Sequence, residues 1–288
     1  MSDPGFSEHT FHSHDGLRLY YRDYGDRLAS RTPLLCLTGL TRNSNDFHEF
    51  ATRHAAIRRV ICLDYRGRGR SAYDPDPMHY EPTVYLNDIQ HLLAVTHVAR
   101  VIVMGTSLGG ILTMALAAAV PTLMAAAIVN DIGPDVKEDG RQRIAGYVGH
   151  ELRPPSWNDA IAHLQQNYIG AYPKLDTAGW QRIARGTFTE DKASGGLKLD
   201  YDPHIAAALK AQARQPLPDL WPLFRSLRPL PLLALRGALS DILTADTFVR
   251  MKREHAGMIA VTVPDVGHVP MLDEPVAETA IDAFLADL

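Results

Sequence analysis

The feature that most constrains the fold is an alternation of short, continuously apolar runs with helical stretches from residue 32 onward. The runs are rich in aliphatic and β-branched residues, which is typical of parallel strands buried on both faces. Segments 45–55 and 81–98, which separate them, have the spacing of amphipathic helices. The pattern predicts an α/β domain whose mostly parallel sheet is covered by helices on both sides. The early strands are predicted at 32–39, 58–65, 99–105 and 124–132.

The alternation stops at about residue 134. The segment that follows is helical in pattern, richer in charge and without a convincing buried strand, until strand-like runs return at 231–237 and 258–265. Before the first buried strand, an alternating antiparallel pair is predicted to turn at Asp15-Gly16. We therefore expect one α/β domain interrupted by a helical insertion. The expected segments are a first core part at 1–133, an insertion at 134–212 and a second core part at 213–288.

A serine stands between glycines where one predicted strand must turn directly into a helix. Gly105-Thr106-Ser107-Leu108-Gly109 fits the pattern Gly-x-Ser-x-Gly. Such a turn forces its corner residue into strained backbone angles, and the glycines let strand and helix approach closely. We therefore expect the Ser107 hydroxyl at the carboxyl edge of the sheet, where ligands bind in such folds. The N–H of Leu108, at the helix start, would face an oxygen bound there.

A hydroxyl becomes a nucleophile only beside a base, and His268 fits that role best among the thirteen histidines. It lies three residues beyond the last predicted strand, on a turn ahead of the closing helix. Asp241 follows the strand that ends at Gly237, so its carboxylate would reach the same edge of the sheet. The chain order Ser107, Asp241, His268 is the one expected for a Ser–Asp–His triad in this architecture.

These residues resemble the α/β-hydrolase family, and the resemblance covers nearly the whole chain. LDYRGRGRS at 63–71 is similar to the family's Asp-x-Arg-Gly-x-Gly-x-Ser turn. RGALSDILT at 236–244 is similar to its acid loop, and VGHVPMLDEP at 266–275 to its histidine loop. The resemblance implies a mostly parallel eight-stranded sheet with helices on both faces, and a helical cap formed by the insertion.

The resemblance also implies an oxyanion hole. Thr38-Gly39-Leu40 stands where many members have His-Gly, so the backbone N–H of Leu40 is the expected second donor beside Leu108. Because some members carry the triad acid after an earlier strand, Asp131 is an alternative to Asp241.

What the resemblance implies about function is a serine hydrolase that cleaves an ester or lactone of a small molecule through an acyl-enzyme on Ser107. No metal or cofactor is needed, and a serine nucleophile argues against epoxide hydrolases and haloalkane dehalogenases, which use a carboxylate. C–C bond hydrolysis of a ring-cleavage product and a ligand receptor without turnover are the alternatives, since both keep the triad. The loop TGLTRNSNDF lacks the His-Gly and Gly-Pro-Gly features associated with C–C hydrolases. In the insertion, Tyr147, Trp157 and Tyr168 are candidate substrate contacts, although aromatic residues there more often belong to a core.

Composition and charge exclude several kinds of partner. A net charge of −4 and a pI of about 6.3 provide no basic face for nucleic acid. Pro121 interrupts the longest apolar stretch, leaving halves too short to span a membrane, and the N-terminus has no secretory signal pattern. Cys36 and Cys62 lie in apolar runs and are expected as buried free thiols, which favours a cytoplasmic location. The sequence does not indicate an oligomeric state.

Two polar clusters have a structural interpretation. We expect Arg66, Arg68 and Arg70 to make structural hydrogen bonds and to face solvent rather than to clamp an anion. We expect the region of His12, His14 and Asp15 to be a solvated turn rather than a metal site, because no further ligand lies nearby in the sequence.

Overall fold

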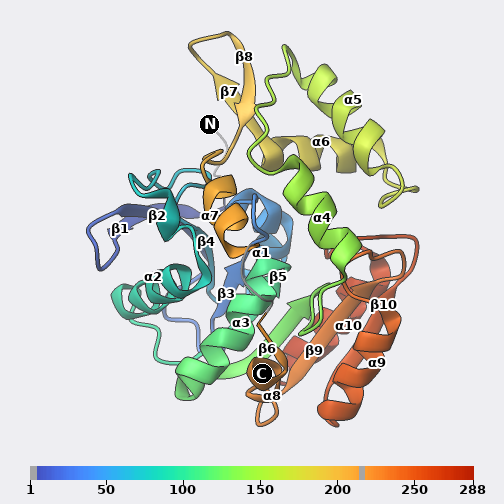
Figure 1. Cartoon of the computed structure of the whole chain (residues 1–288). Coiled ribbons are helices and arrows are strands. Elements are labelled where there is room, and N and C mark those ends of the chain that lie inside the picture. The colour runs from blue at the N-terminus through green and yellow to red at the C-terminus, as the bar shows by residue number, and fades with distance from the viewer. Residues whose placement is uncertain (1–4, 214–217) are drawn as a thin grey trace.

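A computed structural model describes residues 5–213 and 218–288 of the chain. Residues 1–4, and residues 214–217 at the start of the predicted second core part, lie outside the described residues. The centre is an eight-stranded sheet in the order β1-β2-β4-β3-β5-β6-β9-β10, which confirms the predicted fold class (Figure 1). Its strands are β1 (Ser7–His12), β2 (Arg18–Tyr24), β3 (Leu34–Leu37), β4 (Val60–Asp64), β5 (Val101–Thr106), β6 (Met124–Asn130), β9 (Leu232–Gly237) and β10 (Ile259–Val263).

The strand directions follow the sequence pattern. β1 and β2 form the predicted antiparallel hairpin, β2 runs antiparallel to β4, and the pairs from β4 to β10 are parallel. The parallel pairs bring their carboxyl ends to one edge of the sheet, which is where Ser107 and the loops after β6, β9 and β10 meet.

Helices cover both faces because the central strands are apolar along most of their length, with polar residues only near their carboxyl ends. Side chains alternate along each strand, so Leu35 and Leu37 of β3 pack on one face and Leu34 and Cys36 on the other. Cys36 lies opposite Cys62 of β4, and both thiols are buried and free, as predicted. One face is packed by α2 (Pro82–Val95), α3 (Leu108–Ala119), α8 (Trp221–Arg225) and α9 (Ala245–Glu254). The other is packed by α1 (His48–His54) and α10 (Pro275–Ala286).

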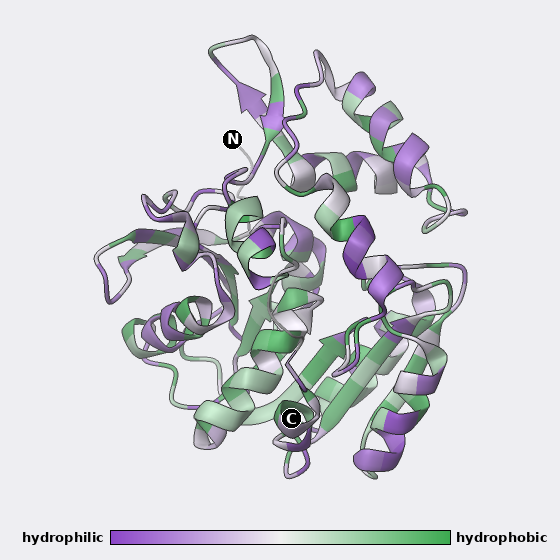
Figure 2. Cartoon of the chain, in the orientation of Figure 1, coloured by the Kyte–Doolittle hydropathy of each residue, from purple (hydrophilic) through white to green (hydrophobic). Residues whose placement is uncertain are grey.

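Most of the segment between β6 and α8 forms a cap beyond the carboxyl edge of the sheet. Figure 1 shows α4, α5, α6 and a small hairpin gathered above the core. Figure 2 shows polar residues on α4, in contrast to the apolar central strands. The elements are α4 (Glu138–Tyr147), α5 (Trp157–Tyr168), α6 (Thr177–Thr187), β7 (Phe188–Asp191), β8 (Gly196–Leu199) and α7 (Ile205–Gln212).

The insertion, expected to be helical in pattern without a convincing buried strand, also contains the short hairpin β7–β8. Its strands are four residues long, and each buries a single apolar side chain, Phe188 or Leu197. Two such short and mostly polar strands have too few residues for a period-2 signal in the sequence.

Arg66 and Arg68 make structural hydrogen bonds, as expected, but the prediction that they face solvent is wrong. Both side chains are completely buried. Arg66 is neutralised by Asp15, Asp74 and Asp88, with Nη2 lying 2.7 Å from an oxygen of Asp88. A buried guanidinium is tolerated only when acceptors surround it, and these carboxylates come from segments far apart in the sequence.

Two of these carboxylates and a nearby histidine lie close enough together to suggest a cation site. One ligand atom each of Asp15, Asp74 and His79 lies within 4.8 Å of the others. The Arg66 guanidinium already bonds to both carboxylates, so its charge occupies the position a cation would need.

None of the helices in the described part of the chain has the length and apolar character that a bilayer span requires.

Candidate active site

The turn at Ser107 has the geometry that the glycine spacing indicates. Ser107 joins β5 to α3 with φ 53° and ψ −116°, a left-handed conformation that non-glycine residues rarely adopt. A Cβ added to Gly105 would lie 2.3 Å from the carbonyl oxygen of Gly109, and one added to Gly109 would lie 2.0 Å from that of Leu37. Only glycine therefore fits at positions 105 and 109. The partly exposed Ser107 is held at the carboxyl edge of the sheet.

The structure brings Ser107 and His268 into direct contact. Nε2 of His268, on the loop after β10, lies 2.9 Å from the Oγ of Ser107. Nδ1 of the same ring lies 2.8 Å from Oδ2 of Asp131, which directly follows β6. The Asp131 side chain is fully buried and that of His268 is 10% exposed, so this hydrogen-bonded chain is shielded from water except near the serine. An imidazole held in this way carries its proton on Nδ1 and presents the Nε2 lone pair to the hydroxyl.

The prediction that Asp241 orients His268 is wrong, and the alternative Asp131 makes that contact. Asp241 forms a two-pronged ion pair with Arg143 of α4, with Nε 2.5 Å from Oδ2 and Nη2 2.9 Å from Oδ1. Partial burial raises the pKa of the Asp241 carboxyl, but the hydrogen bonds and charge of Arg143 outweigh it and hold that pKa below its usual value. The two acids follow neighbouring strands, β6 and β9, so the sequence pattern alone does not separate them. Asp241 lies four residues past the end of β9 and faces the cap, where Arg143 attracts it.

The two backbone N–H groups predicted as oxyanion-hole donors, those of Leu40 and Leu108, belong to the loop after β3 and to the start of α3. Leu108 opens α3, and its N–H has no intrahelical acceptor at that position. Leu40 follows Gly39, and a Cβ added to Gly39 would lie 3.8 Å from the Cβ of Ser107. Among the residues at 5–213 and 218–288, neither N–H has a hydrogen-bond acceptor. The Nε of buried Arg68 donates to the Leu40 carbonyl at 2.8 Å, which holds the next peptide group, Leu40–Thr41, in place.

The predicted substrate contacts lie on two cap helices. Tyr147 ends α4 and Tyr168 ends α5, and their ring centroids are 6.3 Å apart. Burial raises the pKa of both phenols, so both hydroxyls are protonated at neutral pH. Trp157 instead lies 5.0 Å below the guanidinium of Arg185. Contact of any of these three aromatic residues with a substrate stays a prediction.

Residues that the sequence did not single out hold the histidine loop. The Tyr172 hydroxyl, from the cap, accepts from the Val269 N–H at 2.8 Å and donates to the Val269 carbonyl at 2.9 Å. The amide of Asn130 donates to the Pro270 carbonyl at 2.9 Å. A polar residue at the end of an apolar strand was a usable signal for Asn130. No local pattern links Tyr172 to a loop 97 residues away.

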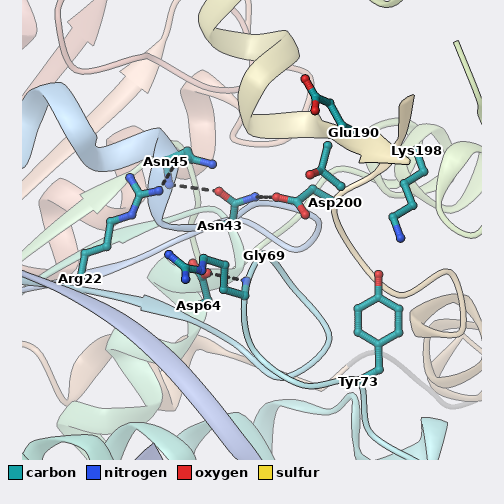
Figure 3. Close-up of a pocket in the computed structure, with 11 residues that line it drawn as sticks. Arg22, Asn43, Asn45, Asp64, Gly69, Tyr73, Glu190, Lys198 and Asp200 are labelled. Atoms are coloured by element: carbon teal, nitrogen blue, oxygen red, sulfur yellow. Dashed lines mark hydrogen bonds between the residues drawn. The ribbon is translucent and has the colours of Figure 1, made fainter. Parts of the chain in front are cut away.

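A second hollow lies apart from these residues. A cavity of about 480 Å³ opens between the core and the β7–β8 hairpin, and Figure 3 shows the polar side chains that line it. The amide of Asn43 donates to the carboxylate of Asp200 at 2.8 Å across this seam. Burial, and then the nearby Asp64, raise the pKa of Asp200 to about 6. Ser107, Asp131 and His268 do not line this cavity.

The fold and the serine–histidine–carboxylate geometry define a class of protein. The sequence model described as the alpha/beta hydrolase family matches residues 34–283, so the chain belongs to this family.

Individual relatives share most of the chain. A 3-hydroxybutyrate-oligomer hydrolase of Cupriavidus necator is 31% identical over 270 residues, which cover 92% of this chain and 91% of the relative. A 2-(acetamidomethylene)succinate hydrolase of Mesorhizobium japonicum is 26% identical over 238 residues, which cover 82% of this chain and 81% of the relative. The crystal structure of an alpha/beta hydrolase from Novosphingobium aromaticivorans superposes with a TM-score of 0.93 at 45% identity and covers 99% of both chains. Hydrolase activity is the property these relatives share with the family.

Proposed function

We propose that this protein is a serine hydrolase that cleaves a carboxylic ester or lactone of a small molecule through an acyl-enzyme on Ser107. The observation that carries the proposal is the position of His268, 2.9 Å from the Ser107 hydroxyl and 2.8 Å from the buried Asp131 carboxylate. A histidine that bridges a hydroxyl and a carboxylate can remove the hydroxyl proton and later return it to a leaving group.

In the first half of the proposed reaction, Ser107 Oγ attacks the acyl carbonyl while its proton passes to Nε2 of His268. Asp131 Oδ2 accepts the Nδ1–H and stabilises the imidazolium that forms. The carbonyl oxygen becomes negatively charged and receives hydrogen bonds from the N–H groups of Leu40 and Leu108. Loss of one such donor typically costs about 3–4 kcal/mol of transition-state stabilisation.

In the second half, the tetrahedral intermediate collapses and the leaving alcohol takes the proton from His268. A water molecule then gives its proton to Nε2 and attacks the acyl carbon, and the second collapse releases the acid and regenerates the Ser107 hydroxyl. For a lactone, acid and alcohol remain parts of one molecule. The chemistry uses only the side chains and backbone of this chain.

One observation supports an oxygen ester as the bond cleaved, and another supports a small molecule as the substrate. The relative from Cupriavidus necator is named for oligomers of 3-hydroxybutyrate, and a hydroxy acid forms oligomers through ester bonds between hydroxyl and carboxyl groups. The cap lies over the carboxyl edge of the sheet that holds Ser107, as expected for a site that encloses a small molecule rather than a polymer surface (Figure 1).

The test is turnover of short-chain p-nitrophenyl esters, followed by acid release from a panel of lactones and 3-hydroxybutyrate oligomers. We expect turnover by the unaltered protein, loss of at least about 10³-fold in kcat with Ser107→Ala, and covalent labelling of Ser107 by a fluorophosphonate. Ser226→Ala is the control, since within the described part of the chain that hydroxyl bonds only to the carbonyls of Met114 and Leu223. Undiminished turnover in Ser107→Ala would overturn the proposal. Labelling without turnover of any ester or lactone would favour a ligand receptor.

A further inference from the structure

The carboxylate of Asp131 is held by more than the histidine. It is fully buried, at φ 53°, and the last residue of β9 and the turn after that strand each supply one further donor. The Gly237 N–H donates to Oδ1 at 2.7 Å, and the Ser240 hydroxyl donates to Oδ2 at 2.6 Å. His268 bonds to that same Oδ2. Ser240 and the histidine therefore share one oxygen atom of the carboxylate.

The direction of the Ser240 hydroxyl is determined by its other partners. A hydroxyl has one hydrogen to donate and two lone pairs that accept. The N–H groups of Ile242 and Leu243 both point at the Ser240 oxygen, at 3.2 and 3.1 Å, and occupy its acceptor positions. Its single hydrogen is thus left for Asp131. A donor preoriented in this way needs no reorganisation when charge moves along the triad.

We propose that Ser240 is a positioning residue of the triad, acting on the reaction through Asp131. This inference rests on the proposed function. With Gly237 on one oxygen and Ser240 on the other, the carboxylate plane cannot rotate, so Oδ2 stays in line with Nδ1 of His268. Without Ser240, only the Gly237 N–H and the histidine would determine that plane.

The sequence around Ser240 gives the proposal a further basis. Its neighbour Asp241 occupies the place where the sequence pattern predicted the triad acid, but its charge is taken by Arg143 of the cap. The turn after β9 therefore still serves the catalytic centre, through the hydroxyl of Ser240 instead of the carboxylate of Asp241. A purely structural role would be that of a turn cap, since the oxygen also accepts the two N–H groups.

The experiment compares Ser240→Ala, Ser240→Cys and Ser240→Thr with a matched control in the same loop. Thr244→Ala removes a hydroxyl that caps α9 by accepting the Thr247 N–H at 3.0 Å and that does not bond to Asp131. We expect Ser240→Ala to lower kcat for a p-nitrophenyl ester roughly tenfold with KM changed less than about twofold. Ser240→Cys, which nearly keeps the volume but donates weakly, should lower kcat to a similar extent. Ser240→Thr, which keeps the hydroxyl, should retain most of the kcat of the unaltered protein. Thr244→Ala should lower the melting temperature and leave kcat within about threefold.

A signal independent of turnover separates this inference from the proposed function. The Nδ1 proton of His268, bonded to Oδ2, gives a far-downfield NMR resonance whose position reports that hydrogen bond. The proposal requires this resonance to shift in Ser240→Ala and not in Thr244→Ala. If the resonance shifts as expected while the unaltered protein turns over no ester, the positioning stands and the proposed function fails. If turnover is present but Ser240→Ala matches the unaltered protein, or Thr244→Ala loses as much kcat, the proposal for Ser240 is overturned.

Discussion

Exchange of the two candidate acids for asparagine is the sharpest test of the triad geometry. In Asp131→Asn, the side-chain oxygen can accept from only one of the two positions that the carboxylate serves. If it faces the Gly237 N–H, the new NH₂ group points at Nδ1 of His268, where the structure has an acceptor at 2.8 Å. The ring must then accept at Nδ1 and carry its proton on Nε2, which cannot take a proton from Ser107. If the amide is flipped, the Gly237 N–H loses its acceptor inside a fully buried site.

The first arrangement removes the base, whereas the flipped one keeps it but sets the NH₂ group against the buried Gly237 N–H. We expect the first to prevail and kcat/KM to fall roughly 10³- to 10⁴-fold in Asp131→Asn, which corresponds to about 4–5.5 kcal/mol of transition-state stabilisation. Asp241→Asn breaks an ion pair whose side chains are 36% and 37% exposed. Loss of such an exposed pair should cost about 1 kcal/mol or less of folding stability. Among the described residues Asp241 makes no hydrogen bond to Ser107, Asp131 or His268, so kcat/KM should fall less than about fivefold.

The assay is steady-state hydrolysis of a p-nitrophenyl ester by both variants, with thermal unfolding to show that each is folded. The reasoning is refuted if Asp131→Asn keeps more than a tenth of the activity, or if Asp241→Asn loses as much as Asp131→Asn does. The second result would mean that the cap ion pair opens during turnover and that Asp241 acts on the histidine.

Two further predictions concern stability. Gly109→Ala places a methyl group 2.0 Å from the Leu37 carbonyl oxygen and should lower the free energy of unfolding by about 3 kcal/mol, measured by urea denaturation. Gly146→Ala is its control, because the added Cβ on this helical glycine meets no atom within 4 Å; a similar loss there would contradict the steric explanation. Burial and the nearby Asp64 raise the pKa of Asp200 to about 6, so its ionised form destabilises the folded state. This loss of folding free energy is absent below about pH 4 and complete above pH 6. Asp200→Asn should therefore be more stable than the unaltered protein by up to about 3 kcal/mol at pH 7.5 and little different at pH 4, as melting temperatures across that range would show; equal differences at both pH values would contradict this account.

Local patterns in the sequence were sufficient for the sheet and for the serine turn. The central strands are apolar along most of their length, which favours a sheet covered on both faces, and all eight strands of this sheet lie where runs or alternation predicted them. Gly105 and Gly109 are required by contacts within a single strand–turn–helix unit, so their spacing around Ser107 has a local cause. His268 was found from the same kind of evidence, a turn directly after a strand.

The choice between Asp131 and Asp241 depended on tertiary structure. Both follow strands that end at the same edge of the sheet, and a motif counts positions along the chain without showing which way a side chain points. The distinction comes from long-range partners: Arg143, 98 residues from Asp241, draws that carboxylate to the cap. The burial of Arg66 and the contact of Tyr172 with the histidine loop have the same origin, because their acceptors lie on distant segments. The sequence by itself thus determined the strands of the central sheet and which serine is presented, since those depend on neighbours along the chain. Only the folded structure decided which acid completes the hydrogen-bonded chain, because that depends on neighbours in space.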